Sequence, residues 1–107
     1  MYYTYMLRCK DNSIYTGMTS NLERRFEEHK TKNEKCAKYT LNHTAIKLEM
    51  AWESETRSQA TKLEYHIKTL TKSQKETLIN KSNNLTSLLS DKLEYNVYNE
   101  IDINKYE

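Results

Sequence analysis

The chain has 107 residues, of which 36% are hydrophobic and 30% are charged. This length and composition predict one domain with a modest core and a heavily charged surface. No apolar run approaches the about 20 residues of a membrane-spanning helix, and residues 1–12 lack the apolar centre of a signal peptide. We therefore expect a cytoplasmic protein with no membrane partner.

The net charge of +2 is too small to indicate a nucleic-acid partner, but the charges are unevenly distributed. Lys and Arg outnumber Asp and Glu in residues 1–79, and the reverse holds in residues 80–107. A mildly basic main part is compatible with phosphate contacts and is also common by chance. Cys9 and Cys36 lack metal-ligand spacing, so we interpret both as reduced thiols.

Two segments rich in aromatic and β-branched residues, 2–7 and 14–18, are predicted to be strands. The polar residues 10–13 between them form a turn cluster, so the two strands are expected to pair as a β-hairpin. A third strand is predicted over 44–52, where apolar and polar residues alternate as in a strand with one buried face. The apolar positions of that strand are Ile46, Leu48 and Met50.

A first helix is expected to follow the hairpin, capped by Ser20 or Asn21. Four of its residues recur at the spacing of one helical face: Leu22, Arg25, Phe26 and His29. Since the other members of this stripe include a leucine and a phenylalanine, Arg25 is expected to point toward the sheet.

A second helix is predicted to begin at Thr56 or Ser58, and Glu64 falls within its inward arc. The apolar members of that arc are Ala60, Leu63, Ile67 and Leu70. A carboxylate facing inward needs a partner, because burying an unpaired charge is costly. A third helix is expected after a cap in residues 71–74, reaching about Ile79.

The last part of the chain is harder to interpret. Three leucines favour a short fourth helix: Leu85, Leu88 and Leu89. After Lys92 the chain is asparagine-rich and acidic, and an ordered accessory strand and a loose tail are equally compatible with this pattern.

Gly17 is the only glycine in a chain that has no proline. Glycine is used where a side chain cannot be tolerated or where φ must be positive. Its place after Tyr15 and before Arg25 predicts a bare backbone next to a tyrosine hydroxyl and an arginine. A site that handles phosphate needs such an arrangement.

Hydrolysis of a phosphodiester needs an activated water, a cation for the charge of the transition state and help for the departing oxygen. Mg²⁺ commonly takes one or two carboxylates and keeps several waters, so Glu64 alone suffices as its protein ligand. The planar fork of Arg25 suits non-bridging oxygens. A tyrosine base is unusual, because its pKa of about 10 must be lowered by nearby cations or by a network of water and metal.

Several segments of the chain resemble the GIY-YIG nuclease domain. They are, in order, Tyr5-Met6-Leu7, Tyr15-Thr16-Gly17, Asn21 to Arg25, and the glutamate-bearing helix of residues 60–68. The resemblance covers roughly residues 2–80 and is strongest to the small, free-standing, YhbQ-like bacterial members. It implies an α/β (α+β) fold with a three-stranded, mainly antiparallel sheet flanked by helices. The nuclease domain is expected over residues 1–82, with residues 83–107 as a C-terminal extension of the same domain.

The resemblance also implies roles for individual residues. Tyr15 matches the tyrosine that activates the attacking water, and Tyr5 matches the one that hydrogen-bonds around that water and the phosphate. Arg25 matches the arginine that steadies the transition state, and Glu64 matches the ligand of a single divalent metal, Mg²⁺ or Mn²⁺. His29 fits a position, one turn after the arginine, that is histidine or tyrosine in many members.

The chain departs from the family in two places. Residues 33–40 stand where similar YhbQ-like proteins have a loop with two glycines, and both glycines are missing here. Met18 stands where the excision-repair relatives have a lysine. The remaining candidates for contact with a nucleic-acid phosphate are Gly17, Lys38, Tyr39 and Thr40.

The predicted function is metal-dependent hydrolysis of DNA phosphodiesters, by nicking or structure-directed cleavage, with RNA as another possible substrate. Because no separate DNA-binding domain is evident, we expect either low sequence specificity or a protein partner that directs the nuclease. Two alternatives stay open: a non-catalytic nucleic-acid-binding module that keeps the fold, and a protein-interaction domain that uses the tyrosine-rich C-terminus.

Each candidate residue also has a purely structural interpretation. A tyrosine in a strand, such as Tyr5 or Tyr15, usually serves packing. The stem of Arg25 can cover apolar surface. Glu64 can form an ion pair with Lys68, which follows at the i, i+4 spacing.

Overall fold

The computed structural model describes residues 1–31, 45–80 and 97–103. Two sets of predicted features lie outside these ranges. They are the short fourth helix and three of the candidate phosphate contacts, Lys38, Tyr39 and Thr40.

The predicted hairpin is confirmed. Strand β1 (Tyr2–Cys9) pairs antiparallel with β2 (Ile14–Thr19). The turn closes where the backbone N–H of Cys9 donates to the carbonyl of Ser13 at 2.9 Å. Asn12 takes a φ of 70° in this turn, a left-handed conformation that asparagine tolerates better than most residues.

The described residues form a sheet of four strands rather than the three predicted. Strand β3 (Ala45–Ser54) pairs antiparallel with β1, and β4 (Asn99–Glu100) pairs antiparallel with β3. The strand order is β2-β1-β3-β4, so β2 is an edge strand. Of the two interpretations of the C-terminal segment, the accessory strand is the one that the structure contains.

Strand β3 does not follow the simple alternation predicted for it. Met6 of β1 is opposite Met50, and Leu7 is opposite Leu48, so Glu49 is an extra residue in β3. Such a bulge moves the following side chains to the other face of the sheet. Leu48 therefore packs on one face and Met50 on the other, and the prediction of a single buried face was wrong.

Helix α1 (Leu22–Thr31) begins after Asn21, as predicted. The Asn21 side-chain oxygen accepts from the backbone N–H of Arg24 at 3.1 Å, which satisfies one of the free donors of the first turn.

Helix α3 (Arg57–Lys68) begins after Thr56, one of the two predicted caps, in a reciprocal capping box with Gln59. Helix α4 (Lys72–Asn80) begins after Thr71, whose hydroxyl accepts from a backbone N–H of the first turn at 3.1 Å. None of the described helices is long and apolar enough to span a lipid bilayer.

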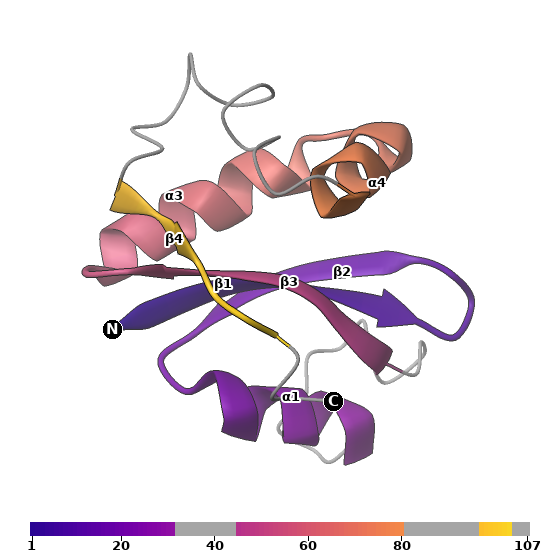
Figure 1. The fold of residues 1–107 in the computed structure, drawn as a ribbon, viewed down its shortest axis with the longest axis horizontal. Coiled ribbons are helices and arrows are strands. Elements are labelled where there is room, and N and C mark those ends of the chain that lie inside the picture. The colour runs from indigo at the N-terminus through magenta and orange to yellow at the C-terminus, as the bar shows by residue number, and fades with distance from the viewer. Residues whose placement is uncertain (32–44, 81–96, 104–107) are drawn as a thin grey trace.

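The sheet lies between two helical layers, with α1 against one face and α3 and α4 against the other (Figure 1). Each face has its own apolar core. The α1 face buries Tyr5, Leu7, Leu22, Phe26, Leu48 and Ala51. The opposite face buries Met6, Ile14, Met50, Trp52, Leu63, Ile67, Leu78 and Tyr98.

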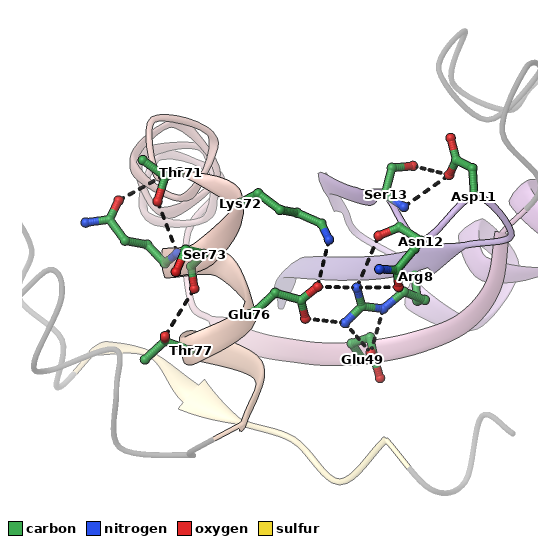
Figure 2. A network of polar contacts seen from close by, with 11 residues as sticks. Arg8, Asp11, Asn12, Ser13, Glu49, Thr71, Lys72, Ser73, Glu76 and Thr77 are labelled. Carbon is green, nitrogen blue, oxygen red and sulfur yellow. Dashed lines mark hydrogen bonds and ion pairs between the residues drawn. The ribbon is translucent and has the colours of Figure 1, made fainter.

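A network of charged side chains fastens α4 to the sheet (Figure 2). The guanidinium of Arg8 donates to both carboxylate oxygens of Glu76, at 2.6 and 2.5 Å, and to Glu49 at 3.0 Å. It also donates to the carbonyl of Asn12 at 3.2 Å, and Lys72 Nζ lies 2.8 Å from Glu76 Oε2. The network therefore joins the hairpin turn, β3 and α4 through one arginine.

Candidate active site

Tyr5 and Gly17 face each other on β1 and β2. The Tyr5 side chain is only 2% exposed and lies over the glycine. A Cβ at position 17 would lie 2.6 Å from Tyr5 Cζ and 3.0 Å from a ring carbon of Tyr15, too close for any ordinary side chain. Since the φ of Gly17 is not positive, glycine is needed here for close approach. The bare backbone beside a tyrosine hydroxyl is thus confirmed, while its contact with a phosphate stays a prediction.

The hydroxyl of Tyr5 is hydrogen-bonded to His29 Nε2 at 3.0 Å. His29 comes from α1 and is completely buried. Burial, with the positive charge of Arg25 as a second cause, lowers the pKa of His29 to about 4. The imidazole is therefore neutral at pH 7, and one ring nitrogen is available as an acceptor.

Arg25 lies on the same face of α1 and takes part in this arrangement. Its Nη1 is 3.1 Å from Glu28 Oε1, and its positive charge lies near enough to Tyr5 to affect the pKa of that phenol. Burial and then the neighbouring Tyr15 raise the pKa of Tyr5, although Arg25 lowers it in part. Because the phenol keeps its proton and the imidazole is neutral, we assign the Tyr5 hydroxyl as the donor to His29 Nε2.

Tyr15 completes the aromatic group on this face. Its ring centroid lies 6.3 Å from that of Tyr5 and 5.2 Å from that of His29. Burial raises the pKa of Tyr15, while the charges of Lys68 and Arg25 lower it by less. The phenol is therefore protonated at neutral pH, and its activation requires further positive charge or a proton acceptor.

Glu64 and Lys68 reach the same place from α3, on the other side of the sheet. Their carboxylate and ammonium groups form an ion pair at 3.1 Å, and Lys68 Nζ lies 5.8 Å from the centroid of the Tyr15 ring. The charge of Glu64 contributes to the raised pKa of both Tyr15 and Tyr5. This meeting is possible because β2 is an edge strand, so α1 and α3 approach it from opposite faces (Figure 1).

The structure therefore gathers the predicted catalytic residues around one edge of the sheet: Tyr5, Tyr15, Arg25, His29 and Glu64. It also contains the structural alternative for the glutamate, the ion pair with Lys68. The contact of Lys68 with Tyr15 was missed. The i, i+4 spacing indicates the ion pair, but the ring contact depends on how α3 crosses the edge of β2.

The donor atoms at this edge limit which metal fits. Within the ranges that the structure describes, no three His, Cys, Asp or Glu side chains lie together as ligands. The side chain of Glu64 is 21% exposed and already holds a cation, the ammonium of Lys68. A single accessible carboxylate suits a hard divalent ion that keeps most of its waters, such as Mg²⁺.

The model of the GIY-YIG catalytic domain matches residues 1–77. The chain therefore belongs to the GIY-YIG family, and the predicted resemblance is confirmed. Membership in this family points to a nuclease-type function.

Within the family, the chain is similar to UPF0213 proteins. It is 46% identical over 80 residues to UPF0213 protein FN1575 of Fusobacterium nucleatum, covering 75% of this chain and 78% of that protein. It is 40% identical over 89 residues to UPF0213 protein YhbQ of Salmonella arizonae, covering 83% and 87%. The solution NMR structure of UPF0213 protein BH0048 from Bacillus halodurans is 36% identical, with a TM-score of 0.49, covering 75% of this chain and 84% of that one.

Proposed function

We propose that this protein is a metal-dependent nuclease that hydrolyses DNA phosphodiester bonds. The observation that supports the proposal is the convergence of an arginine, two tyrosines, a neutral histidine and a carboxylate at the edge of β2. These groups come from β1, β2, α1 and α3, and only the fold brings them together.

In the proposed mechanism, Arg25 binds a non-bridging phosphate oxygen and stabilises the charge that develops there. Tyr5, fixed by its hydrogen bond to His29, lies beside Arg25 and holds the attacking water in place. Glu64 would hold Mg²⁺ or Mn²⁺, and the bound ion would supply positive charge for the departing oxygen and lower the pKa of coordinated water.

Tyr15 is the proposed base for the attacking water. Because burial raises its pKa, its phenolate is a minor species at neutral pH, stabilised by Lys68 and Arg25. The cleavage rate is therefore expected to rise by up to about tenfold per pH unit through the neutral range, as for a base that must first lose its proton.

A specific observation favours a second candidate, the non-catalytic nucleic-acid-binding module. The carboxylate of Glu64 is already neutralised by Lys68, and the phenol of Tyr15 carries its proton. In such a module, Arg25 binds phosphate and the hydroxyl of Tyr15 contributes little. The two candidates therefore differ in what the loss of that hydroxyl does.

The deciding experiment is a cleavage assay on labelled single-stranded, flap and branched DNA and on RNA, with Mg²⁺, Mn²⁺ or EDTA. Tyr15→Phe is compared with Tyr65→Phe, whose tyrosine on α3 is 63% exposed. We expect metal-dependent cleavage that falls by ~10²- to 10⁴-fold in Tyr15→Phe and is unchanged in Tyr65→Phe. Full cleavage by Tyr15→Phe would exclude the proposed base. Binding by the wild type without cleavage of any substrate would favour the module.

A further inference from the structure

Lys75 on α4 is a half-buried lysine for which the described structure offers no carboxylate. At three and four residues' spacing it shares an arc with Leu78, which is buried, and Ile79, which is half-buried. The first turn of α4 contains no acidic residue, and Lys75 forms no ion pair within the described ranges. Burial and the charge of Lys68 both lower its pKa.

Lys72, one turn earlier on the same helix, shows how such a charge is normally accommodated. Its ammonium lies 2.8 Å from Glu76 Oε2, and its side chain is 48% exposed. A half-buried ammonium beside a second lysine has lost part of its hydration without gaining an opposite charge, which costs free energy. Among the described residues, an ion pair accounts for Lys72, and no such pair accounts for Lys75.

Lys68 connects Lys75 to the candidate active site. It is the last residue of α3, and only residues 69–71 separate it from the start of α4, the helix that contains Lys75. Its Nζ lies 5.8 Å from the centroid of the Tyr15 ring. The lowered pKa of Lys75, to which Lys68 contributes, agrees with this placement. An ammonium has three donors, so Lys68 is able to keep its bond to Glu64 and bind an anion as well. Positive charge thus extends from the tyrosine cluster, formed by Tyr5, Tyr15 and His29, along the end of α3 to the start of α4.

We propose that Lys68 and Lys75 form a second phosphate-binding position, which takes the phosphate of a nucleotide adjacent to the reacting one. The inference rests on the proposed function in one respect, that the ligand is a nucleic-acid strand. Phosphate neutralisation by lysine provides affinity without reading sequence, which agrees with a strand held by its backbone.

The test is the binding of a fluorescent single-stranded DNA oligonucleotide in EDTA, so that no cleavage takes place, measured by anisotropy over a range of salt concentrations. Each lost phosphate contact is expected to reduce the slope of log affinity against log salt by about 0.7. Lys75→Gln and Lys68→Gln should each show this reduction. Lys72→Gln, which removes an equal charge from the same helix as Lys75, should leave the slope unchanged.

A thermal unfolding measurement accompanies the binding assay. Lys75→Gln removes repulsion from Lys68, so its unfolding midpoint without ligand should equal or exceed that of the wild type. Reduced binding by a more stable variant cannot then be attributed to misfolding. A lower midpoint together with unchanged binding would show that Lys75 serves the fold and would overturn the proposal.

The remaining outcomes separate this inference from the nuclease proposal. If the wild type binds and the slope of Lys75→Gln is unchanged, or if Lys72→Gln loses as much, the second position is refuted and the nuclease proposal stands. If the slopes fall as expected but no metal supports cleavage, the second position stands and the nuclease proposal fails. The absence of salt-dependent binding by the wild type would refute both.

Discussion

The Arg8 network and the tyrosine cluster lie on opposite faces of β1 and treat charge in opposite ways. Arg8 is matched by two carboxylates from different elements, Glu49 and Glu76. On the other face, Tyr5 is bonded to His29, a neutral imidazole, and both side chains are buried. Fixed charges are paired in the first group, and titratable groups are kept neutral in the second.

The pKa shifts of the two groups reveal the same difference. Hydrogen bonds from Arg8 and Lys72 lower the pKa of Glu76 to about 2, so this carboxylate stays ionised at any ordinary pH. In the tyrosine cluster, burial is the first cause of each shift, and it favours the neutral forms of Tyr15 and His29. Titratable groups whose pKa is shifted by burial beside a specific charge are typical of functional sites. Charged groups that are all paired with opposite charges, in contrast, typically stabilise the fold.

The largest expected effect is on catalysis. Arg25→Lys keeps the charge but loses the planar fork, so cleavage should fall by ~10²- to 10³-fold, as for the loss of one transition-state donor. The control is Arg24→Ala, which removes an exposed arginine from the same helix. Single-turnover cleavage measures both variants. A greater loss in Arg24→Ala would show that the wrong face of α1 has been assigned to the site.

The second prediction uses pH to separate the contributions of the tyrosine cluster and the Arg8 network to stability. The pKa of His29 falls from 6.5 in the unfolded chain to about 4 in the folded one, so the unfolded chain binds the extra proton between these values. The contribution of His29 to the free energy of unfolding should therefore stay constant above pH 6.5. It should decrease by about 3 kcal/mol as the pH falls to 4, at about 1.4 kcal/mol per unit of pKa shift.

Urea unfolding of His29→Gln at several pH values tests this assignment, because the variant should lack that decrease. Glu76 titrates in a lower window. Since its folded pKa is lowered from 4.5 to about 2, its contribution is present above pH 4.5 and is lost as the pH falls toward 2. Glu76→Gln should therefore keep the decrease between pH 6.5 and 4. Equal pH profiles for wild type and His29→Gln would contradict the burial of a neutral imidazole.

The third prediction breaks the Arg8 network. Arg8→Met leaves Glu49 and Glu76 without their shared cation, which should lower the free energy of unfolding by about 2 kcal/mol, less than for a fully buried pair because both carboxylates are partly exposed. Cleavage measured well below the unfolding midpoint should be unchanged. A loss of activity without a loss of stability would show that Arg8 serves the active site rather than the stability of the fold.

Much of the fold and of the candidate site was predictable, because many of their features depend on residues close together in the sequence. The caps Asn21 and Thr56, and the stripe that carries Arg25 inward, follow from short-range spacing. The bulge at Glu49 was not predictable, because it is defined by the register with β1. The two-residue strand β4 has no apolar alternation to reveal it.

The electrostatics of the site were only partly predictable, for a related reason. Cations near Tyr15 were expected to lower its pKa, and two of them do so, but burial has the larger effect. That burial comes from packing between elements far apart in the sequence. The proximity of Lys68 and Lys75 was not predictable for a different reason, because it depends on how the chain turns between α3 and α4.

The smallest expected effects concern two threonines. Among the described residues, one has a hydrogen-bonded hydroxyl and the other does not. Thr4 on β1 donates its hydroxyl to the carbonyl of Ala60 at 2.9 Å, which ties the sheet to α3. The hydroxyl of Thr16 on β2 is buried and has no hydrogen-bond partner among the described residues. Valine has the same shape without the hydroxyl. Thr4→Val should therefore lower the free energy of unfolding by about 1 kcal/mol, and Thr16→Val should raise it by about 1 kcal/mol. Urea midpoints at unchanged m-value measure both changes. Destabilisation by Thr16→Val would mean that its hydroxyl is bonded in solution, and the contrast between the two threonines would then be lost.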